Sequence, residues 1–129
     1  MRIIDGVAFA HDELLPRLRV SRKVGAVALH PVCPLAKMNL APRLEAIGRA
    51  CSETIFVPQQ AGCCGFAGDR GWLFPELTEA ATRTQSAEAK AGKFDGCFSS
   101  SRTCEVGMTR AVGRIYRSYI YLLEETTRQ

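Results

Sequence analysis

Six cysteines are the residues best suited to chemistry in this chain of 129 residues. Cys63 and Cys64 are adjacent, Cys33 precedes them, and Cys104 follows them further along the chain. The first residues lack the apolar segment of a signal peptide, so we expect a cytoplasmic protein, and disulfides are rare in the cytoplasm. In that compartment an excess of cysteine indicates metal binding or redox chemistry before it indicates a disulfide framework. Thiolates are the usual ligands of iron–sulfur clusters and of many zinc sites.

The composition is that of one globular domain. Hydrophobic residues make up 47% of the chain and charged residues 23%, which is unlike a disordered protein. We expect a single domain over residues 1–129, because this length leaves no room for a flavin-binding domain and a substrate domain as well. The net charge of +4 is spread without a dense basic run, so we expect no nucleic-acid partner. No segment approaches the roughly 20 apolar residues of a transmembrane helix.

The elements that must position the cysteines follow from the pattern of apolar residues. Residues 24–29 and 54–57 are continuous apolar runs, as expected of strands buried on both faces. The helical segment 75–91 begins at Pro75 and is followed by Gly92, which are common helix boundaries. The expected elements are helices at 5–20, 35–51, 75–91 and 114–126, and strands at 24–29, 54–57 and 94–99. This alternation predicts the α/β class, a three-layer sandwich with a small, mostly parallel sheet.

Four of the cysteines follow the ends of predicted strands. Cys33 comes just after the first strand, Cys63 and Cys64 come after the second, and Cys104 comes shortly after the third. In a parallel sheet the carboxyl ends of the strands meet at one edge, where ligands commonly bind. We therefore expect these four thiols to converge at one edge of the sheet.

The order of these cysteines resembles that of the cysteine-rich CCG domain. That domain carries a Cys, a Cys-Cys pair and a Cys-x-x-Cys at long intervals. It occurs in heterodisulfide reductases, glycolate oxidase iron–sulfur proteins, lactate-utilisation proteins and FAD-linked D-lactate dehydrogenases. Here Cys33, the Cys63-Cys64 pair and Ser101-Arg102-Thr103-Cys104 follow that order. The fuller segments 63–71, 100–105 and 116–125 look most like those of the D-lactate dehydrogenases.

The resemblance implies a role within a larger flavoprotein. In that dehydrogenase group the module follows an FAD-binding portion and a ferredoxin-like [4Fe-4S] segment, and those domains are its implied partners. The flavin oxidises a 2-hydroxy acid to a 2-oxo acid, and the electrons leave through iron–sulfur centres. The resemblance therefore implies electron transfer by an iron–sulfur cluster on Cys33, Cys63, Cys64 and Cys104. The isolated piece, with no place for FAD, is expected to be inactive, and peripheral association with the inner membrane would come through its partners.

One position departs from the CCG pattern. Ser101 stands where the first Cys of Cys-x-x-Cys is expected, and a serine hydroxyl is a poorer cluster ligand because it is hard to deprotonate. Four thiols are still enough for one cluster. Two alternatives stay open: a metal-free interaction or structural module of the same oxidoreductase, and a mononuclear zinc site on the four cysteines.

Three further residues lie beside the cysteine motif. His30 precedes Cys33 at a strand end; it could tune a metal site through a hydrogen bond, or simply bond a loop carbonyl. Gly65 belongs to a glycine-rich loop that lacks the Gly-x-Gly-x-x-Gly form of a dinucleotide site. Arg70, in the same loop, could face an anion near a helix start. We include Gly65 and Arg70 with the candidate cofactor-binding residues.

The remaining cysteines and a row of arginines have plainer interpretations. Cys51 lies on the apolar stripe of a predicted helix and is interpreted as a core residue. Cys97 falls within the third predicted strand and is also assigned to the core, although it is near enough to the sheet edge to replace the missing thiol. Arg110, Arg114 and Arg117 recur at helical spacing, which fits a solvated face or a docking surface for partner domains.

Overall fold

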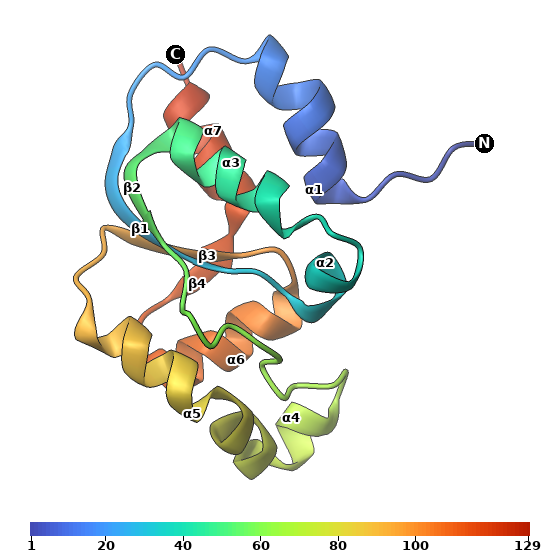
Figure 1. Ribbon diagram of the computed structural model, residues 1–129, viewed down its shortest axis with the longest axis vertical. Coiled ribbons are helices and arrows are strands. Elements are labelled where there is room, and N and C mark those ends of the chain that lie inside the picture. The colour runs from blue at the N-terminus through green and yellow to red at the C-terminus, as the bar shows by residue number, and fades with distance from the viewer.

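The computed structural model describes all 129 residues and contains one four-stranded parallel sheet (Figure 1). The strands are β1 (Val24–His30), β2 (Ser52–Phe56), β3 (Gly96–Ser99) and β4 (Tyr116–Ser118). Their order across the sheet is β2-β1-β3-β4, and all three pairings are parallel. This arrangement confirms the predicted α/β class with a small parallel sheet.

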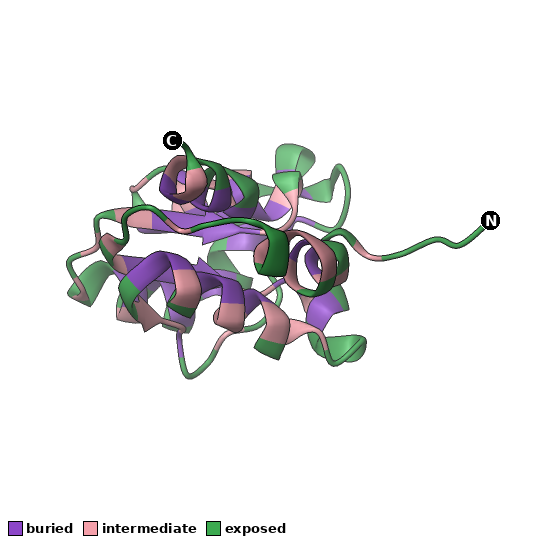
Figure 2. Cartoon of the chain, turned by 90° about the horizontal axis from the view of Figure 1, so that it is seen from above, coloured by how far each residue is buried: buried purple, intermediate pink, exposed green.

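Helices cover both faces of the sheet. The α-helices are α1 (Gly6–Phe9), α2 (Cys33–Lys37), α3 (Ala41–Cys51), α4 (Arg70–Leu73), α5 (Pro75–Ala91), α6 (Arg102–Val112) and α7 (Tyr119–Thr127). α1, α3 and α7 lie on one face and α5 and α6 on the other (Figure 1). Seen from above, the strands form a buried layer between the two helical layers (Figure 2). The three-layer sandwich is therefore present.

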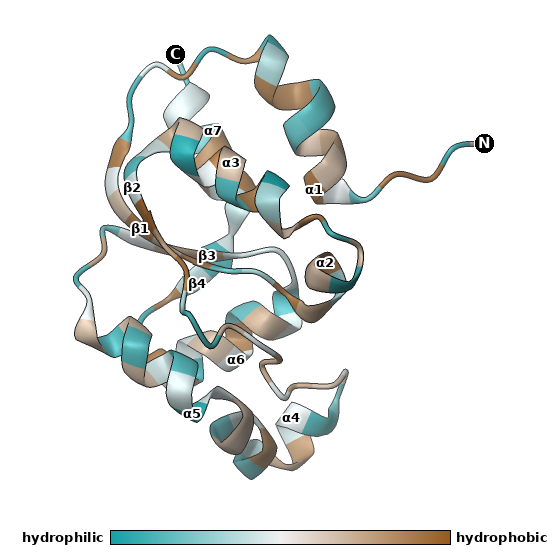
Figure 3. Cartoon of the chain, viewed as in Figure 1, coloured by the Kyte–Doolittle hydropathy of each residue, from teal (hydrophilic) through white to brown (hydrophobic).

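β1 is the central strand of the core. It pairs with β2 on one edge and with β3 on the other. Its last four residues, from Val27 to His30, are all buried. Hydrophobic residues are concentrated along β1 and β2, whereas they alternate with hydrophilic residues along α3 and α5 (Figure 3). This is the pattern of a central strand buried on both faces and of helices with one face in the core. The prediction that residues 54–57 are buried on both faces is wrong, because β2 is an edge strand and Thr54 is exposed.

Two hydrophobic clusters fill the space on either side of the sheet. The first packs the residues of α3 and α7 against the sheet, including Leu44, Ile47 and Leu122. The second lies under α5 and α6. Its buried members are Ala28, Ala89, Cys97, Met108, Val112 and Tyr116. No helix is both long enough and apolar enough to cross a membrane.

Most predicted elements are present, with three corrections. The helix predicted at 35–51 is divided into α2 and α3, because Asn39 adopts a φ of 56° that interrupts helical geometry. The N-terminal helix predicted at 5–20 continues beyond α1 as a π-helical turn and then a 3₁₀ turn that ends at Arg17. The helix predicted at 114–126 is wrong at its start, because β4 precedes α7 and Ser118 caps that helix through its side chain.

One helix is missing from the predicted elements. α6 nevertheless carries a helical pattern, because its buried residues Cys104, Met108 and Val112 recur every fourth residue. It ends at Gly113, whose φ of 77° is a left-handed conformation suited to glycine at a helix end. Its buried face uses Cys104, Gly107 and Met108, and it packs against α5.

We expect Met108→Ala to destabilise the fold. Met108 is fully buried in the second cluster, so its truncation should lower the free energy of unfolding by about 2–5 kcal/mol. Met38 is 48% exposed, and Met38→Ala should change that free energy by less than about 0.5 kcal/mol. Urea unfolding followed by circular dichroism measures both, and equal losses for the two variants would contradict this description of the core.

Candidate functional site

The four cysteines lie where three parallel strands end. Cys33 is the first residue of α2, shortly after β1. Cys63 and Cys64 lie in the segment after β2, which we call the cysteine loop (residues 62–71). Cys104 lies in the first turn of α6, shortly after β3. In Figure 1 the cysteine loop passes beside the start of α6, below α2. The fold thus brings together thiols that are far apart in the sequence.

The thiols are close enough to influence one another. The Sγ atoms of Cys64 and Cys104 are 3.0 Å apart. Burial raises the pKa of the Cys33 thiol, and the neighbouring thiols of Cys63 and Cys64 raise it further. Cys33 in turn contributes to the raised pKa of Cys104. Cys64 and Cys104 are thus in direct contact, whereas no group of three or more of these side chains is gathered as a metal ion would need.

Cys64 is the thiol best prepared to act as a thiolate. A hydrogen bond from the Cys104 thiol lowers the pKa of Cys64 to about 6, against the opposing effect of burial, and the backbone N–H of Phe66 lowers it further. The same interaction raises the pKa of Cys104, because that thiol donates its proton to the bond. The pair therefore contains one thiolate and one thiol at neutral pH, and the thiolate is the form that binds metals.

The cysteine loop has little freedom where it crosses α5. Gly65 has a φ of 70°, and a Cβ added there would lie 2.6 Å from the Leu77 carbonyl oxygen and 2.8 Å from the Ala81 Cβ. Its N–H donates to the Cys63 Sγ at 3.3 Å. The role of Gly65 is thus to permit close contact with α5 and to provide a backbone donor to sulfur.

Two buried side chains hold the peptide between Gly62 and Cys63. His30 is fully buried, and its Nε2 donates to the Gly62 carbonyl at 3.1 Å while its Nδ1 lies 3.2 Å from the Ser99 Oγ. Gln85 donates from Nε2 to the Cys63 carbonyl at 3.1 Å and accepts from the Gly62 N–H at 3.4 Å. Because the Gly62 carbonyl can only accept, Nε2 must carry the proton of a neutral His30, and burial lowers the pKa of this imidazole.

His30 therefore makes the loop-carbonyl bond that the sequence allowed. It positions the cysteine loop rather than joining the thiols as a ligand. Sequence reasoning missed Gln85, although a signal existed. Leu77, Ala81 and Gln85 recur every fourth residue on α5, so they share one helix face, and that face contacts the cysteine loop.

Arg70 has no partner within the protein. It is exposed at the start of α4, and its guanidinium forms no hydrogen bond. Arg110 of α6 contacts the cysteine loop instead: its guanidinium lies 4.5 Å from the centre of the Trp72 ring and donates to the Gly71 carbonyl at 3.3 Å. The loop thus uses an arginine from α6 rather than its own Arg70.

The other two arginines of the predicted row have separate partners. Arg114 donates to the Gly92 carbonyl at 2.6 Å. Arg117 lies in β4 and forms a two-point ion pair with Glu125 at 2.7 and 3.1 Å. Because Arg117 is in a strand and Arg110 is in a helix, the three side chains do not form one continuous helical face.

Comparison with known families decides which group the chain belongs to. Residues 27–109 match the CCG cysteine-rich domain. The chain belongs to the CCG family. The matched segment runs from β1 through most of α6 and contains all four converging thiols. No curated protein and no solved structure matches the chain.

Ser101 lies beside the thiols of the CCG domain, at the position that the motif predicts. It precedes α6, its hydroxyl is 3.2 Å from the Thr103 Oγ1, and its interaction with Cys104 lowers the pKa of that thiol. Ser101 therefore acts on the thiol site as a hydrogen-bonding neighbour.

The remaining two cysteines of the CCG domain are in the core. Cys51 is fully buried in the first cluster, and Cys97 is buried in the second, beside Tyr116. Burial raises the pKa of both thiols. The core interpretation of Cys51 and Cys97 agrees with their positions.

The donor set of this CCG domain fits a redox or metal-binding module. All six cysteines are free thiols, and the four that converge provide soft sulfur ligands with one thiolate already favoured. No group of three or more His, Cys, Asp or Glu side chains is gathered as a single metal ion would require.

We expect Gly65→Ala to cost more stability than Gly68→Ala. Both glycines have a left-handed φ, but nothing lies within 4 Å of a Cβ built at Gly68. Each substitution should cost about 1–2 kcal/mol for the left-handed backbone, and Gly65→Ala should cost a further 1–3 kcal/mol or so for its overlap with α5. Urea unfolding measures the difference, and equal costs would show that the cysteine loop does not depend on its contact with α5.

We expect one thiolate of the reduced, metal-free protein to titrate with a pKa of about 6. The ultraviolet absorbance of thiolates measures it. Cys64→Ser should remove this titration, and Cys104→Ala should move it upward, because Cys64 loses its donor. Cys51→Ala should leave it unchanged. Loss of the low titration in Cys51→Ala, or its persistence in Cys64→Ser, would contradict the assignment.

The same shift predicts how stability depends on pH. The pKa of Cys64 is lower in the folded protein than its ordinary value of 9.0, so the unfolded chain binds more protons between these pH values. This contribution to the free energy of unfolding should be complete above pH 9.0 and should disappear as the pH falls through about 6. Comparing the pH dependence of unfolding for the protein and for Cys64→Ser below pH 9.0, where Cys104 remains protonated, measures it.

Proposed function

We propose that this chain is the iron–sulfur module of an FAD-linked 2-hydroxy-acid dehydrogenase of the D-lactate type, in which it relays electrons from the flavin. The observation that carries the proposal is that Cys33, Cys63, Cys64 and Cys104 all follow the ends of parallel strands at one edge of the sheet. Membership of the CCG family supports a redox or metal-binding role. The whole chain would be one CCG domain within a larger flavoprotein.

The residues of the chain would act as ligands and as their supports. Cys33, Cys63, Cys64 and Cys104 would hold a [4Fe-4S] cluster, which supplies one-electron transfer when bound. The Gly65 N–H, which donates to the Cys63 sulfur, would raise the potential by stabilising added negative charge. Ser101 would donate to the cluster environment through its hydroxyl rather than serve as a full ligand.

The exposure of the thiols suggests a direction for electron transfer. Cys63 is exposed, whereas Cys64 and Cys104 are buried. The FAD-binding and ferredoxin-like domains of the parent protein would therefore approach over the cysteine loop, where a ligand sulfur reaches the surface. His30 and Gln85 would keep that sulfur in place by holding the backbone on either side of the Gly62–Cys63 peptide bond.

Anaerobic reconstitution tests the proposal. The reduced chain, treated with ferrous iron and sulfide, should turn brown and retain both elements after desalting. Cys33→Ala and Cys63→Ala should each lose most of the visible absorption, whereas Cys51→Ala, which removes a core thiol, should retain it. Circular dichroism of each variant establishes that it has folded.

Two results would overturn the proposal. A colourless protein without metal after anaerobic reconstitution would favour the metal-free interaction module. Purified protein with about one zinc per chain and no iron would favour the mononuclear site.

Ser101→Cys provides a complementary test. The substitution supplies the fifth thiol of the CCG pattern beside Cys104, so the reconstituted variant should retain more iron and lose its colour more slowly in air. Thr103→Cys adds a thiol at a neighbouring position of α6 that is outside the CCG pattern, and it serves as the control. If Thr103→Cys gave the same gain as Ser101→Cys, position 101 would have no special relation to the site.

A further inference from the structure

Two of the converging thiols form a pair in direct contact. The Sγ atoms of Cys64 and Cys104 are 3.0 Å apart, and both residues are free cysteines. A disulfide bond joins sulfurs at about 2.0 Å, so an approach of about 1 Å would bring these two within bonding distance. A direct contact between two ligand sulfurs has no role in the proposed electron transfer. The pair therefore indicates a chemistry of its own.

Backbone packing holds the two thiols together. Cys104 and Gly107 are three residues apart and share one face of α6. The Cys64 side chain lies on that face, because a Cβ built at Gly107 would be 3.5 Å from the Cys64 Cβ and 3.4 Å from the Phe66 ring. Phe66 is fully buried and anchors the cysteine loop just after Cys64. The contact thus results from the packing of the cysteine loop against α6.

The pair is shielded from large molecules, but it lies under a short surface loop. Cys64 is 3% exposed and Cys104 is 6% exposed. Residues 62–63 and 67–70 of the same loop are exposed on either side of Cys64. Segments with little buried surface open locally at a low cost in free energy. Such an opening admits a small oxidant to the Cys64 sulfur more readily than it admits a protein or a bulky disulfide.

We propose that Cys64 and Cys104 are a site of reversible oxidation, where hydrogen peroxide converts the two thiols of the metal-free protein into a disulfide. The disulfide occupies two of the four cluster ligands, so the site cannot be loaded until a dithiol reduces it. The disulfide itself does not depend on the proposed function, whereas its effect on cluster loading rests on that function.

The oxidation proceeds in two steps that balance. The Cys64 sulfur attacks one oxygen of hydrogen peroxide, the O–O bond breaks, and the other oxygen leaves as water with the thiol proton, which gives a sulfenic acid. The Cys104 sulfur then attacks the Cys64 sulfur, the S–O bond breaks, and hydroxide leaves as a second water with the Cys104 proton. Two electrons pass from the sulfurs to the peroxide. A dithiol reverses the reaction by thiol–disulfide exchange.

The contact with Cys104 also limits the damage to Cys64. A sulfenic acid without a neighbouring thiol is oxidised further to a sulfinic acid, which is irreversible in most proteins. The Cys104 sulfur, 3.0 Å away, captures the sulfenic acid first. The pair thus keeps the oxidation at a stage from which the thiols can be recovered.

Peroxide treatment of the reduced, metal-free full chain tests the site. An equimolar amount of hydrogen peroxide should lower the number of free thiols from six by two, and dithiothreitol should restore them. Mass spectrometry of the alkylated, digested protein should show one disulfide, between the peptides that carry Cys64 and Cys104. The proposal is overturned if no thiols are lost or if the disulfide joins another pair, such as Cys33 and Cys63.

Matched variants separate the pair from the other thiols. Cys104→Ser should not form the disulfide, and with excess peroxide its Cys64 should gain the two oxygen atoms of a sulfinic acid. Cys51→Ala removes a thiol from the core and should still form the disulfide. Circular dichroism verifies that each variant is folded. Equal oxidation of Cys64 to the sulfinic acid in Cys104→Ser and in the unaltered protein would show that Cys104 does not capture the sulfenic acid.

Cluster transfer tests the effect on loading. A scaffold protein that carries a [4Fe-4S] cluster, mixed with the chain without added thiol, should load the reduced chain and should not load the oxidised chain until dithiothreitol is added. Equal loading of both forms would overturn the regulatory role. Failure of the reduced chain to load would instead contradict the proposed iron–sulfur function, while the mapped disulfide would remain.

Discussion

Strand β1 is the central strand of the sheet. It needs a partner strand at each edge and a helical layer on each face, and the rest of the molecule provides them. Its backbone groups are bonded to β2 on one edge and β3 on the other, and its side chains from Val27 to His30 are buried. A parallel strand in this position needs helices on both faces, because apolar side chains alternate between the two. Every connection must therefore return through a helix, and all strands end at the same edge. The meeting of the thiols follows from this requirement.

Polar residues at that edge fix the conformation of the cysteine loop. A glycine-rich loop by itself would have many conformations. The cysteine loop is restricted by buried His30 on one side and buried Gln85 on the other, which bond the backbone at Gly62 and Cys63. Gly65 then lets the chain touch α5 closely enough for Cys64 to reach Cys104. The low pKa of Cys64 results from this contact. It therefore depends on the residues that hold the cysteine loop in place.

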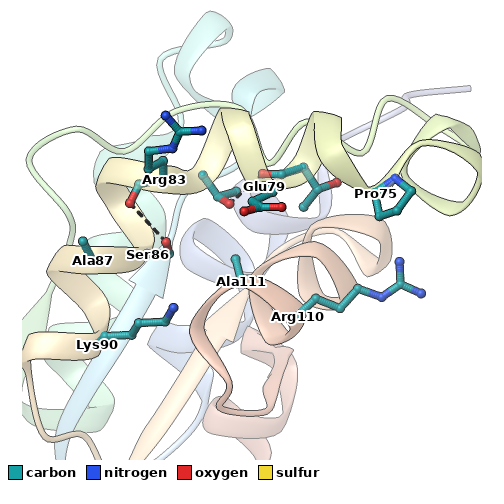
Figure 4. Close-up of a pocket in the computed structure, with 10 residues that line it drawn as sticks. Pro75, Glu79, Arg83, Ser86, Ala87, Lys90, Arg110 and Ala111 are labelled. Carbon is teal, nitrogen blue, oxygen red and sulfur yellow. Dashed lines mark hydrogen bonds between the residues drawn. The ribbon is translucent and has the colours of Figure 1, made fainter.

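Helix α5 serves the molecule on two neighbouring faces. One face holds the cysteine loop, and the other lines an open polar cleft against α6 (Figure 4). Because α6 begins beside Cys104 and also carries Arg110, the two helices connect both regions through short, well-packed segments. Arg110 links them directly, since it lines the cleft and also donates to the loop at Gly71.

The sequence by itself determined the α/β class, the position of α5 and the meeting of Cys33, Cys63, Cys64 and Cys104, because these depend on apolar periodicity and on strand order. The role of Cys51 in the core could also be predicted, since it lies on a clear apolar stripe. Only the tertiary structure decided that β4 exists and that Arg110 rather than Arg70 contacts the cysteine loop. α6 and Gln85 had signals in the sequence that were missed, since Cys104, Met108 and Val112 recur every fourth residue and Leu77, Ala81 and Gln85 share one face of α5. The remaining features arise from contacts between residues that are distant in the chain, and local sequence patterns do not show which distant residues will meet.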